Sequence, residues 1–517
     1  MVFTSIQSGH ESDREDVVKD KSVFEEGEGA DRRSAVHCNR RGTEDSDRCR
    51  RHWLVCIMRI HPSVKCYNSY IGISARSSVE LFRRHGITPF RNILTTKFFN
   101  SLSVRKMRSS TVLIPEVVFW LMATVALTEG AMTAAVISFW APLRTIFPRL
   151  TLQPVTEEAF CTARKLLPVS FFRNVFLEIV SRYLRLFGQR YLWRGFHLWG
   201  IDGTVVSLPA CKTLQDKYGT FSNRHGFNSH PESLLVGLVG LWNGLCRDFL
   251  LVPVKRGEQL CARFLIRLLG VDDLLICDRN FSSFRIFVSV LARGAHFIIR
   301  LPSTRFLNAR HISAPSGRAS EWLVDLTLPA RLRKQFPLFP KTLRLRVIQY
   351  QIRGFRPSRL ITSLCDTQKY PYEELVWLYH ERWRQETVHR EWKHTLQISN
   401  LRSKSPNGIL KEVFVQLTLN NIVRWIMTEA AGKTRRPVEL QFLKSKRLIL
   451  AAVAPMATAP VEWLSFMYKH LVSEVARSVI VVRPGRSYPR RRRKGFYDRR
   501  ERVPVQATGR GDPNVFI

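Results

Sequence analysis

The sequence of 517 residues lacks the features that mark membrane, secreted and disulfide-rich proteins. Its most apolar run, Val117 to Thr128, is closed by Glu116 and Glu129. The run is shorter than the roughly 20 residues that span a bilayer, so it predicts a buried helix. The N-terminus is acidic and polar and has no signal-peptide pattern. The ten cysteines form no C-x-x-C pair, which favours reduced thiols in the cytoplasm over disulfides or a zinc site.

Negative charge is also scarce. There are 42 Asp and Glu against 81 Lys and Arg, and the formal net charge is +39. Self-repulsion of this size predicts a polyanionic partner, with nucleic acid as the first candidate and an anionic membrane surface as the second. Hydrophobic residues make up 45%, which is ordinary for a soluble protein and enough for two or three domains with a core.

The segment Tyr372 to Leu396 contains neither Pro nor Gly, and its composition predicts one continuous helix. Taking Tyr379 as the reference, three charged residues fall on one narrow stripe of that helix, with Arg382 at about −60°, Glu386 at about −20° and Lys393 at about −40°. Such a stripe can handle phosphate or metal. On an isolated helix it can equally be a solvated face with Glu/Arg pairs.

Two further acids accompany strand patterns. Asp202 lies within the apolar run from Phe196 to Pro209, and Asp278 ends the buried-type run from Asp273 to Cys277. Each taken alone can be a turn former or a helix cap. Two such acids and a helix-borne glutamate together favour three carboxylates that converge on divalent metal.

These residues resemble a known family, the DDE transposases of bacterial insertion sequences of the insertion-element-four type. The most specific likeness is the helix signature, in which Tyr379, Arg382, Glu386 and Lys393 follow one another at intervals of three, four and seven residues. The resemblance runs from about Arg91 to Tyr488.

The segments Ile-Asp202-Gly-Thr and Cys-Asp278-Arg-Asn-Phe match the other two acid motifs of this family. One departure is Asn280, where Gly is more usual. Asn also tolerates positive φ, so we expect the turn to be kept.

The order of the core is three strands, a helix and a strand, and the resemblance implies an α/β fold with a ribonuclease-H-like catalytic core. We place an α-helical N-terminal transposase domain at 86–190 and the catalytic domain at 191–430, with a mainly β insertion at about 297–357. A C-terminal helical region and basic tail follow at 431–517. Residues 1–85 are either a disordered extension or an over-long reading of the start.

The resemblance also implies the chemistry. Asp202, Asp278 and Glu386 would bind two Mg²⁺ ions, with Mn²⁺ as a substitute, for cleavage at the element's ends and joining to target DNA. Tyr379, Arg382 and Lys393 would contact the DNA backbone. The partners implied are double-stranded DNA and a second copy of the chain in a synaptic homodimer, with no membrane, in the bacterial cytoplasm at the nucleoid.

Several alternatives remain open at this stage. The helices of 86–190 either recognise the element's ends or only pack against the core. Trp322 in the insertion is a candidate wedge or stacking residue, although core packing is the commoner role of a large aromatic. The basic run from Arg483 to Lys494 predicts phosphate contact or a solvated tail. The whole chain could also be a metal-dependent nuclease of the same fold, an inactive DNA-binding relic, or a peripheral membrane protein.

Overall fold

The structure is a computed structural model that describes residues 90, 93–102, 112–127, 155–223, 226–302, 310–313, 320–352 and 356–481. The predictions for residues 1–85 and for the basic run from Arg483 to Lys494 lie outside the described residues.

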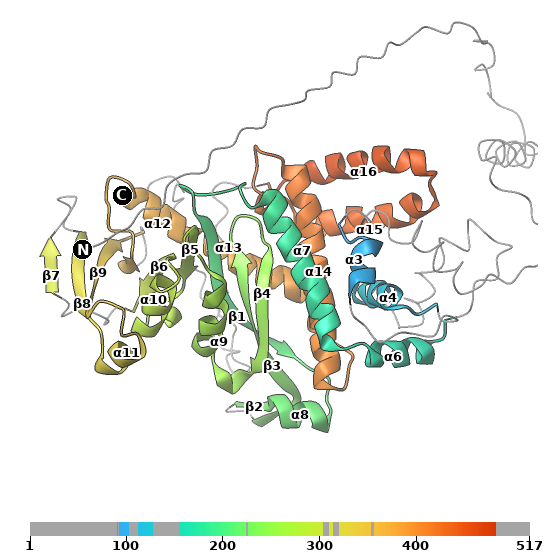
Figure 1. Cartoon of the computed structure of the whole chain (residues 1–517), viewed down its shortest axis with the longest axis horizontal. Helices are drawn as coiled ribbons and strands as arrows, with labels where there is room; N and C mark the ends of the chain where they lie inside the picture. Colours follow the sequence, from blue (N-terminus) through green and yellow to red (C-terminus); the bar gives the residue numbers. More distant parts are fainter. Residues whose placement is uncertain are drawn as a thin grey trace, which may run out of the picture. The chain divides into compact units, whose positions relative to one another are not determined.

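One mixed sheet organises the described part of the chain, and helices cover it (Figure 1). Its ten strands run in the order β2-β3-β1-β5-β6-β10-β9-β8-β7, with β4 paired to β3. Strands β1, β5 and β6 are parallel and the other pairs are antiparallel. The strands are β1 (His197–Ser207), β2 (Thr220–Asn223), β3 (Gly226–Gly240), β4 (Cys246–Pro253), β5 (Asp273–Cys277), β6 (His296–Leu301), β7 (Arg310–Ser313), β8 (Glu321–Thr327), β9 (Thr342–Tyr350) and β10 (Ser358–Thr362).

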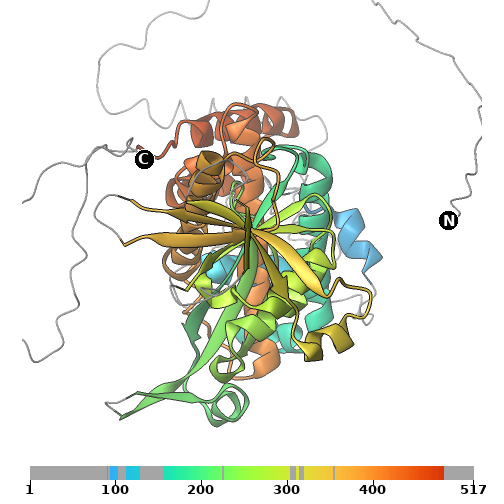
Figure 2. The same cartoon turned by 90° about the vertical axis from the view of Figure 1, so that its left-hand side faces the viewer.

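The predicted order of three strands, a helix and a strand is present as β1, β3, β4, α9 (Glu258–Leu265) and β5. The sequence around Tyr218 predicts an irregular stretch, but the structure has regular elements there. The stretch forms α8 (Lys212–Tyr218) and then β2, which makes a hairpin with β3 that extends away from the rest of the sheet (Figure 2).

The region predicted as a mainly β insertion contains β7, β8 and β9, with the short helix α11 (Ala330–Gln335) between the last two. These strands continue the same sheet through β10 rather than forming a separate one. The alternation that predicted a half-exposed strand is visible in β9, where Leu343 and Leu345 are buried while Arg344 between them is exposed.

The described parts of 86–190 are helical, as the apolar runs predicted. They form α3 (Thr96–Ser101), α4 (Pro115–Leu127), α6 (Glu157–Leu166) and α7 (Val169–Phe187). Their apolar residues belong to the same hydrophobic cluster as those of the sheet. The predicted buried helix is α4, whose residues 116–123 are all buried. Among the described residues, no helix combines the length and apolar character that a membrane crossing requires.

The prediction of one continuous helix over 372–396 was wrong in one respect, because the segment consists of three helical pieces. They are α12 (Tyr372–His380), α13 (Trp383–Arg390) and a π-helical turn, η6 (Glu391–Thr395). At the joint between α12 and α13 the backbone uses bonds between residues three apart, such as Arg384 N–H to Glu381 O at 2.9 Å. The wider π turn at the end shifts Lys393 from the angle that a regular helix gives it.

The sequence from Glu412 to Met427 predicts an amphipathic helix that closes the core, and this prediction was also wrong. The helix α14 runs from Pro406 to Ala431 and is buried on nearly every side. It packs against α4, α7, β4 and the C-terminal helices α15 (Phe442–Thr458) and α16 (Val461–Ala476), and Figure 1 shows α7 and α14 side by side. Because helices lie on both its sides, no face of α14 is left for solvent.

Candidate active site

The register of the sheet brings the two strand-borne acids to the same level. Gly200 of β1 pairs with Ile276 of β5 in a parallel ladder, so two residues further on Asp202 stands beside Asp278. The thiol of Cys277 also points to the Ile201 carbonyl oxygen, at 3.7 Å. Residues 76 positions apart thus meet because their strands are neighbours and run the same way.

Two glycines let the signature helix approach the sheet closely. A Cβ on Gly200 would lie 2.1 Å from Gln385 Oε1, and one on Gly237 would lie 2.7 Å from the Trp392 ring. Gln385 also donates from Nε2 to the Gly237 carbonyl oxygen at 3.3 Å. Asp202 faces the same side of β1 as Gly200, because side chains two apart in a strand share a face. The helix that carries Glu386 is therefore held over the face of β1 that Asp202 occupies.

The guanidinium of Arg382 lies among the three predicted acids. Its Nη2 donates to Glu386 Oε1 at 3.0 Å in an i,i+4 ion pair. It is also within electrostatic reach of Asp202 and Asp278, which are in reach of each other. Burial lowers the pKa of Arg382, but Tyr379, Glu386 and Asp278 outweigh this and the pKa is raised. A single cation thus balances part of the charge of three carboxylates.

Asp202 is the most perturbed of these acids. Burial raises its pKa to about 6, and the neighbouring carboxylates of Glu258 and Asp278 add to the rise. The Gly203 N–H and the Arg382 guanidinium act in the opposite direction. A carboxylate with a raised pKa is short of positive partners, as expected where a cation is to be bound.

The other two signature residues lie differently. Tyr379 is only 4% exposed and packs within a second apolar cluster, with its hydroxyl in reach of Asp278 and Arg382. Burial raises the pKa of Tyr379. Lys393 lies in the π turn, and partial burial lowers its pKa. No interaction within the described residues joins Lys393 to the three acids.

The sequence reasoning missed two charged residues beside the acids. Glu258 begins α9, where its carboxylate contacts the Gly203 backbone and accepts a hydrogen bond from Asn280 Nδ2 at 2.6 Å. Arg300 ends the strand after Asp278, at the same level, because Cys277 pairs with Ile299. Both could have been found from the sequence, because each is a charged residue near the end of a predicted strand or at the start of a predicted helix.

The two aspartates fit a hard divalent cation. Each uses Oδ1 to accept the backbone N–H of the following residue, at 2.9 Å for Asp202 and 2.5 Å for Asp278. No described residue hydrogen-bonds to the other oxygen of either, and oxygen is the ligand that Mg²⁺ prefers. Glu386, in contrast, is paired with Arg382. In the described ranges no group of three or more His, Cys, Asp or Glu is arranged to hold one ion.

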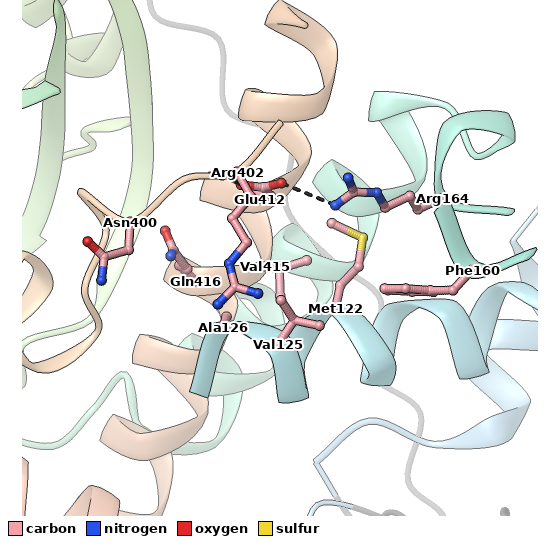
Figure 3. Close-up of a pocket in the computed structure, with 10 residues that line it drawn as sticks. All are labelled: Met122, Val125, Ala126, Phe160, Arg164, Asn400, Arg402, Glu412, Val415 and Gln416. Atoms are coloured by element: carbon pink, nitrogen blue, oxygen red, sulfur yellow. Dashed lines mark hydrogen bonds and ion pairs between the residues drawn. The ribbon is translucent and has the colours of Figure 1, made fainter. Parts of the chain in front are cut away.

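A separate small pocket, open to solvent, lies between α4, α6 and α14 (Figure 3). None of the predicted site residues lines it. Its main polar feature is Glu412, which accepts from Arg164 at 3.3 Å, from the Arg402 N–H at 2.8 Å and from Ser403 Oγ at 2.5 Å. The contacts fasten the loop that follows the signature helix, so we regard this pocket as structural.

A protein-family model described as "Transposase DDE domain" matches residues 201–422. The matched range begins one residue before Asp202 and ends in α14, so it contains both aspartates and Glu386. The class defined by the sheet, the acids and this match is a DDE transposase domain.

A comparison with curated proteins narrows the class. The chain is 25% identical over 342 residues to the transposase InsG for insertion sequence element IS4 of Escherichia coli (strain K12), which covers 65% of this chain and 76% of that protein. The chain is thus similar to the DDE transposases of the insertion-element-four type. Among solved structures it is similar to the piggyBac transposase in a cryo-EM structure of its synaptic complex with hairpin DNA, at a TM-score of 0.37 and 10% identity, covering 79% of this chain and 87% of that one.

Proposed function

We propose that the protein is a DNA transposase that cuts the ends of an insertion sequence and joins them to target DNA. The observation that carries this proposal is the gathering of Asp202, Asp278 and Glu386 around Arg382. Two of these acids stand side by side at the ends of parallel strands, and the third is on a helix packed over them. The matched family model and the curated relative support the same reaction.

The fold we propose for residues 191–430 is ribonuclease-H-like. The sheet order β3-β1-β5-β6, with β1, β5 and β6 parallel and β3 antiparallel, supports this assignment. Helices lie on both faces: Gly200 contacts α13, whereas Gly203, an odd number of residues away, contacts α9. The strands of the insertion lengthen the far side of the same sheet.

Asp202 and Asp278 would hold a divalent cation, Mg²⁺ or Mn²⁺, and Glu386 would join them once Arg382 releases its carboxylate. Such ions supply an activated water and neutralise charge on the phosphate under attack. A DNA phosphate is a natural competitor for Arg382, because a guanidinium binds phosphate oxygens in pairs. We propose that arriving DNA takes Arg382 and thereby frees Glu386.

The remaining signature residues have supporting roles in this proposal. The Tyr379 side chain is buried, so it positions the neighbouring Arg382, and only its hydroxyl is near the phosphate. Lys393 contributes a point charge to the DNA backbone farther along the helix. Trp322 is half-buried and packs against the main cluster, which supports a core role rather than a wedge.

The partners we propose are double-stranded DNA, as element ends and as target, and a second copy of the chain in the synaptic complex. The proposed location is the bacterial cytoplasm at the nucleoid. A metal-dependent nuclease of the same fold would use the same acids. A strand-transfer assay with pre-cleaved ends separates the two, because a nuclease gives no joined product.

The decisive experiment is cleavage of DNA that carries the inverted repeats flanking the reading frame, with and without Mg²⁺. We expect cleavage by the natural protein, none by Asp202→Ala, and full activity for Asp216→Ala, an exposed acid on α8 that serves as the matched control. Retention of cleavage by Asp202→Ala would refute the proposed function, and so would the absence of all cleavage by the natural protein.

A further inference from the structure

The loop between β8 and β9, residues 328–341, is a compact element that we call the α11 loop. Its two ends are joined by a hydrogen bond from the Leu328 N–H to the Lys341 carbonyl oxygen at 2.9 Å. Leu328 and Leu332 are buried, and Phe336 and Phe339 pack partly buried against the main cluster with ring centroids 6.3 Å apart. Four apolar side chains therefore anchor the loop to the sheet.

The tip of this loop points one apolar side chain into solvent. The Phe339 N–H donates to the Phe336 carbonyl oxygen at 3.0 Å, which closes a tight turn with Pro337 and Leu338 at its centre. Proline at the first central position pre-sets the backbone of such a turn. Leu338 is 99% exposed, whereas the next most exposed large apolar side chain in the described residues, Val481, is 73% exposed. A fixed turn thus presents a leucine that has nothing to pack on.

Positive charge surrounds this leucine. Residues 328–341 contain no acid and four cations, which are Arg331, Arg333, Lys334 and Lys341. All four are exposed, and none of their side chains forms a hydrogen bond or ion pair with a described residue. The nearest acid of the adjoining strand, Asp325, already accepts two hydrogen bonds from Arg344, at 3.1 and 3.2 Å. The loop therefore offers uncompensated charge around an apolar tip.

We infer that the α11 loop is a second contact for duplex DNA, in which Leu338 inserts between adjacent base pairs and the surrounding cations bind phosphates. The inference rests on the proposed function. Proteins that bend DNA combine these two elements, an apolar wedge that partly unstacks a base step and cations that hold the backbone on either side. Burial of a fully exposed leucine offsets part of the cost of the unstacking.

The strand register places this contact away from the acids. Arg300, at the level of Asp278, pairs with Leu360, and Leu360 pairs with Ile348 of β9. The α11 loop joins β9 at Thr342, six residues earlier, which is about 20 Å along the strand. Figure 1 shows α11 below the strands and α12 above them. The three strand spacings from β5 to β9 add about 14 Å sideways, so the total separation is about 25 Å. A kink at Leu338 would therefore bend the DNA about seven base pairs from the phosphate that is cut, taking about 3.4 Å for each base pair.

The test uses the full-length protein and a random-sequence duplex with donor and acceptor dyes at its two ends. We expect the natural protein to raise energy transfer by bending the duplex. Leu338→Ala should lose at least half of that rise and bind about tenfold more weakly, whereas Leu338→Met should keep both. The matched control is Leu166→Ala, a leucine that is 63% exposed on α6. Bending by Leu338→Ala equal to that of the natural protein would overturn the inference.

The cations are tested separately, through the salt dependence of binding to the same duplex. Replacing Arg331 and Arg333 by Gln should reduce the slope of log affinity against log salt by about 2, since each phosphate contact contributes about 0.9. The control removes the same charge from two arginines that already have acid partners, Arg194 with Glu374 and Arg477 with Glu474. An equal reduction of the salt-dependence slope in both double variants would overturn the assignment of phosphate contacts to this loop.

An anionic lipid surface could also bind cations and an apolar tip, so a further experiment tests lipid binding. Phosphatidylglycerol vesicles replace the duplex, and we expect no binding that depends on Leu338. Vesicle binding lost in Leu338→Ala, with unchanged DNA bending, would overturn the inference in favour of a membrane. The end-cleavage assay keeps the two proposals apart. Absence of cleavage would refute the proposed function. Bending that requires Leu338 would still establish the α11 loop as a DNA contact.

Discussion

At the scale of the residue, Arg382 occupies the position in which the acids need a cation. It neutralises Glu386 directly and Asp202 and Asp278 at longer range. Removing it leaves three carboxylates to repel one another, and the same removal frees the oxygen atoms that a divalent ion would bind. The charge of Arg382 and the affinity for metal should therefore oppose each other in the absence of DNA.

Arg382→Gln is expected to lower the melting temperature in EDTA and to gain more from added Mg²⁺ than the natural protein does. For a chain of this length, a difference of 1 kcal/mol between the two gains corresponds to about 1 °C. Differential scanning fluorimetry with and without Mg²⁺ measures it, and Arg477→Gln, whose arginine pairs with Glu474, is the control. Equal Mg²⁺ shifts in the natural protein and Arg382→Gln would show that the acids do not compete for a cation.

His389 makes the stability depend on pH. It is 6% exposed, its Nε2 has no hydrogen-bond partner, and burial together with Lys393 lowers its pKa to about 4. An unfolded histidine takes up its proton near pH 6.5, so the unfolded chain binds more protons between pH 6.5 and 4. The folded protein consequently loses stability as the pH falls through that window.

His389→Phe keeps a ring beside Trp392 but cannot titrate. We expect its free energy of unfolding to fall less steeply than that of the natural protein between pH 7 and pH 4, by about 3 kcal/mol over the interval. Urea unfolding at several pH values checks this. His470→Phe, an exposed histidine on α16, should leave the slope unchanged. Parallel curves for His389→Phe and the natural protein would contradict the assignment.

At the scale of the element, close contact between the signature helix and the sheet sets the position of Glu386. Trp392 is fully buried, and its ring occupies the space that a side chain at Gly237 would need. The ring also donates from Nε1 to Asn420 Oδ1 at 3.1 Å, so α14 holds it from the other side. The tryptophan therefore has no room to retreat.

Gly237→Ala should destabilise the fold by about 1–3 kcal/mol, because the new methyl group would lie 2.7 Å from the Trp392 ring. It should also reduce end cleavage, since η6, and α13 that leads into it, must move away from β3. Chemical denaturation and the cleavage assay measure the two effects. Gly270→Ala is the control, because a Cβ there meets nothing within 4 Å. Unchanged stability and cleavage in Gly237→Ala would mean that the helix can shift without a cost in free energy.

The sequence allowed most elements to be predicted, and the errors have physical causes. Apolar runs located the strands around Asp202 and Asp278, because such runs reflect burial in a sheet. Composition could not reveal the π turn at η6 or the joint at Glu381, since both depend on tertiary partners. Glu381, for example, is held by Trp242 Nε1 at 2.8 Å and Arg436 Nη1 at 3.1 Å. The amphipathic pattern expected of α14 was misleading because its polar residues are buried against other elements, as Asn421 is against Cys246 and Thr428 against Tyr183.

The candidate site was predictable only as a set of acids. Their spacing in the chain says nothing of register, which is what places Asp202 beside Asp278. The ion pair between Arg382 and Glu386 follows from helix spacing, but the reach of Arg382 to the strand acids does not. Glu258 was missed because a glutamate at a helix start is common and has no motif of its own.

At the scale of the whole molecule, the N-terminal helices and the sheet share one hydrophobic cluster. Phe176 of α7 packs against Phe249 of β4 at 5.6 Å and against Phe414 of α14 at 5.9 Å, measured between ring centroids. The residues described between 90 and 190 thus complete the core of the catalytic part. A boundary near 190 would cut through packed aromatic rings.

A fragment of residues 191–517 is therefore expected not to fold on its own. It should show no cooperative thermal transition by circular dichroism and should bind a dye that reports exposed apolar surface. A chain that begins at Tyr70 keeps every described helix and is the control, expected to melt cooperatively. A sharp transition for the 191–517 fragment would show that the N-terminal helices are an independent domain.

The burial of α14 on all sides has a consequence for synthesis of the protein. This helix is translated after the sheet and the N-terminal helices that enclose it, so the emerging polypeptide displays a wide apolar cleft until residue 431 has left the ribosome. Nascent chains in that state are prone to aggregate. High-level expression should accordingly yield inclusion bodies, and slower translation at low temperature or co-produced chaperones should raise the soluble fraction.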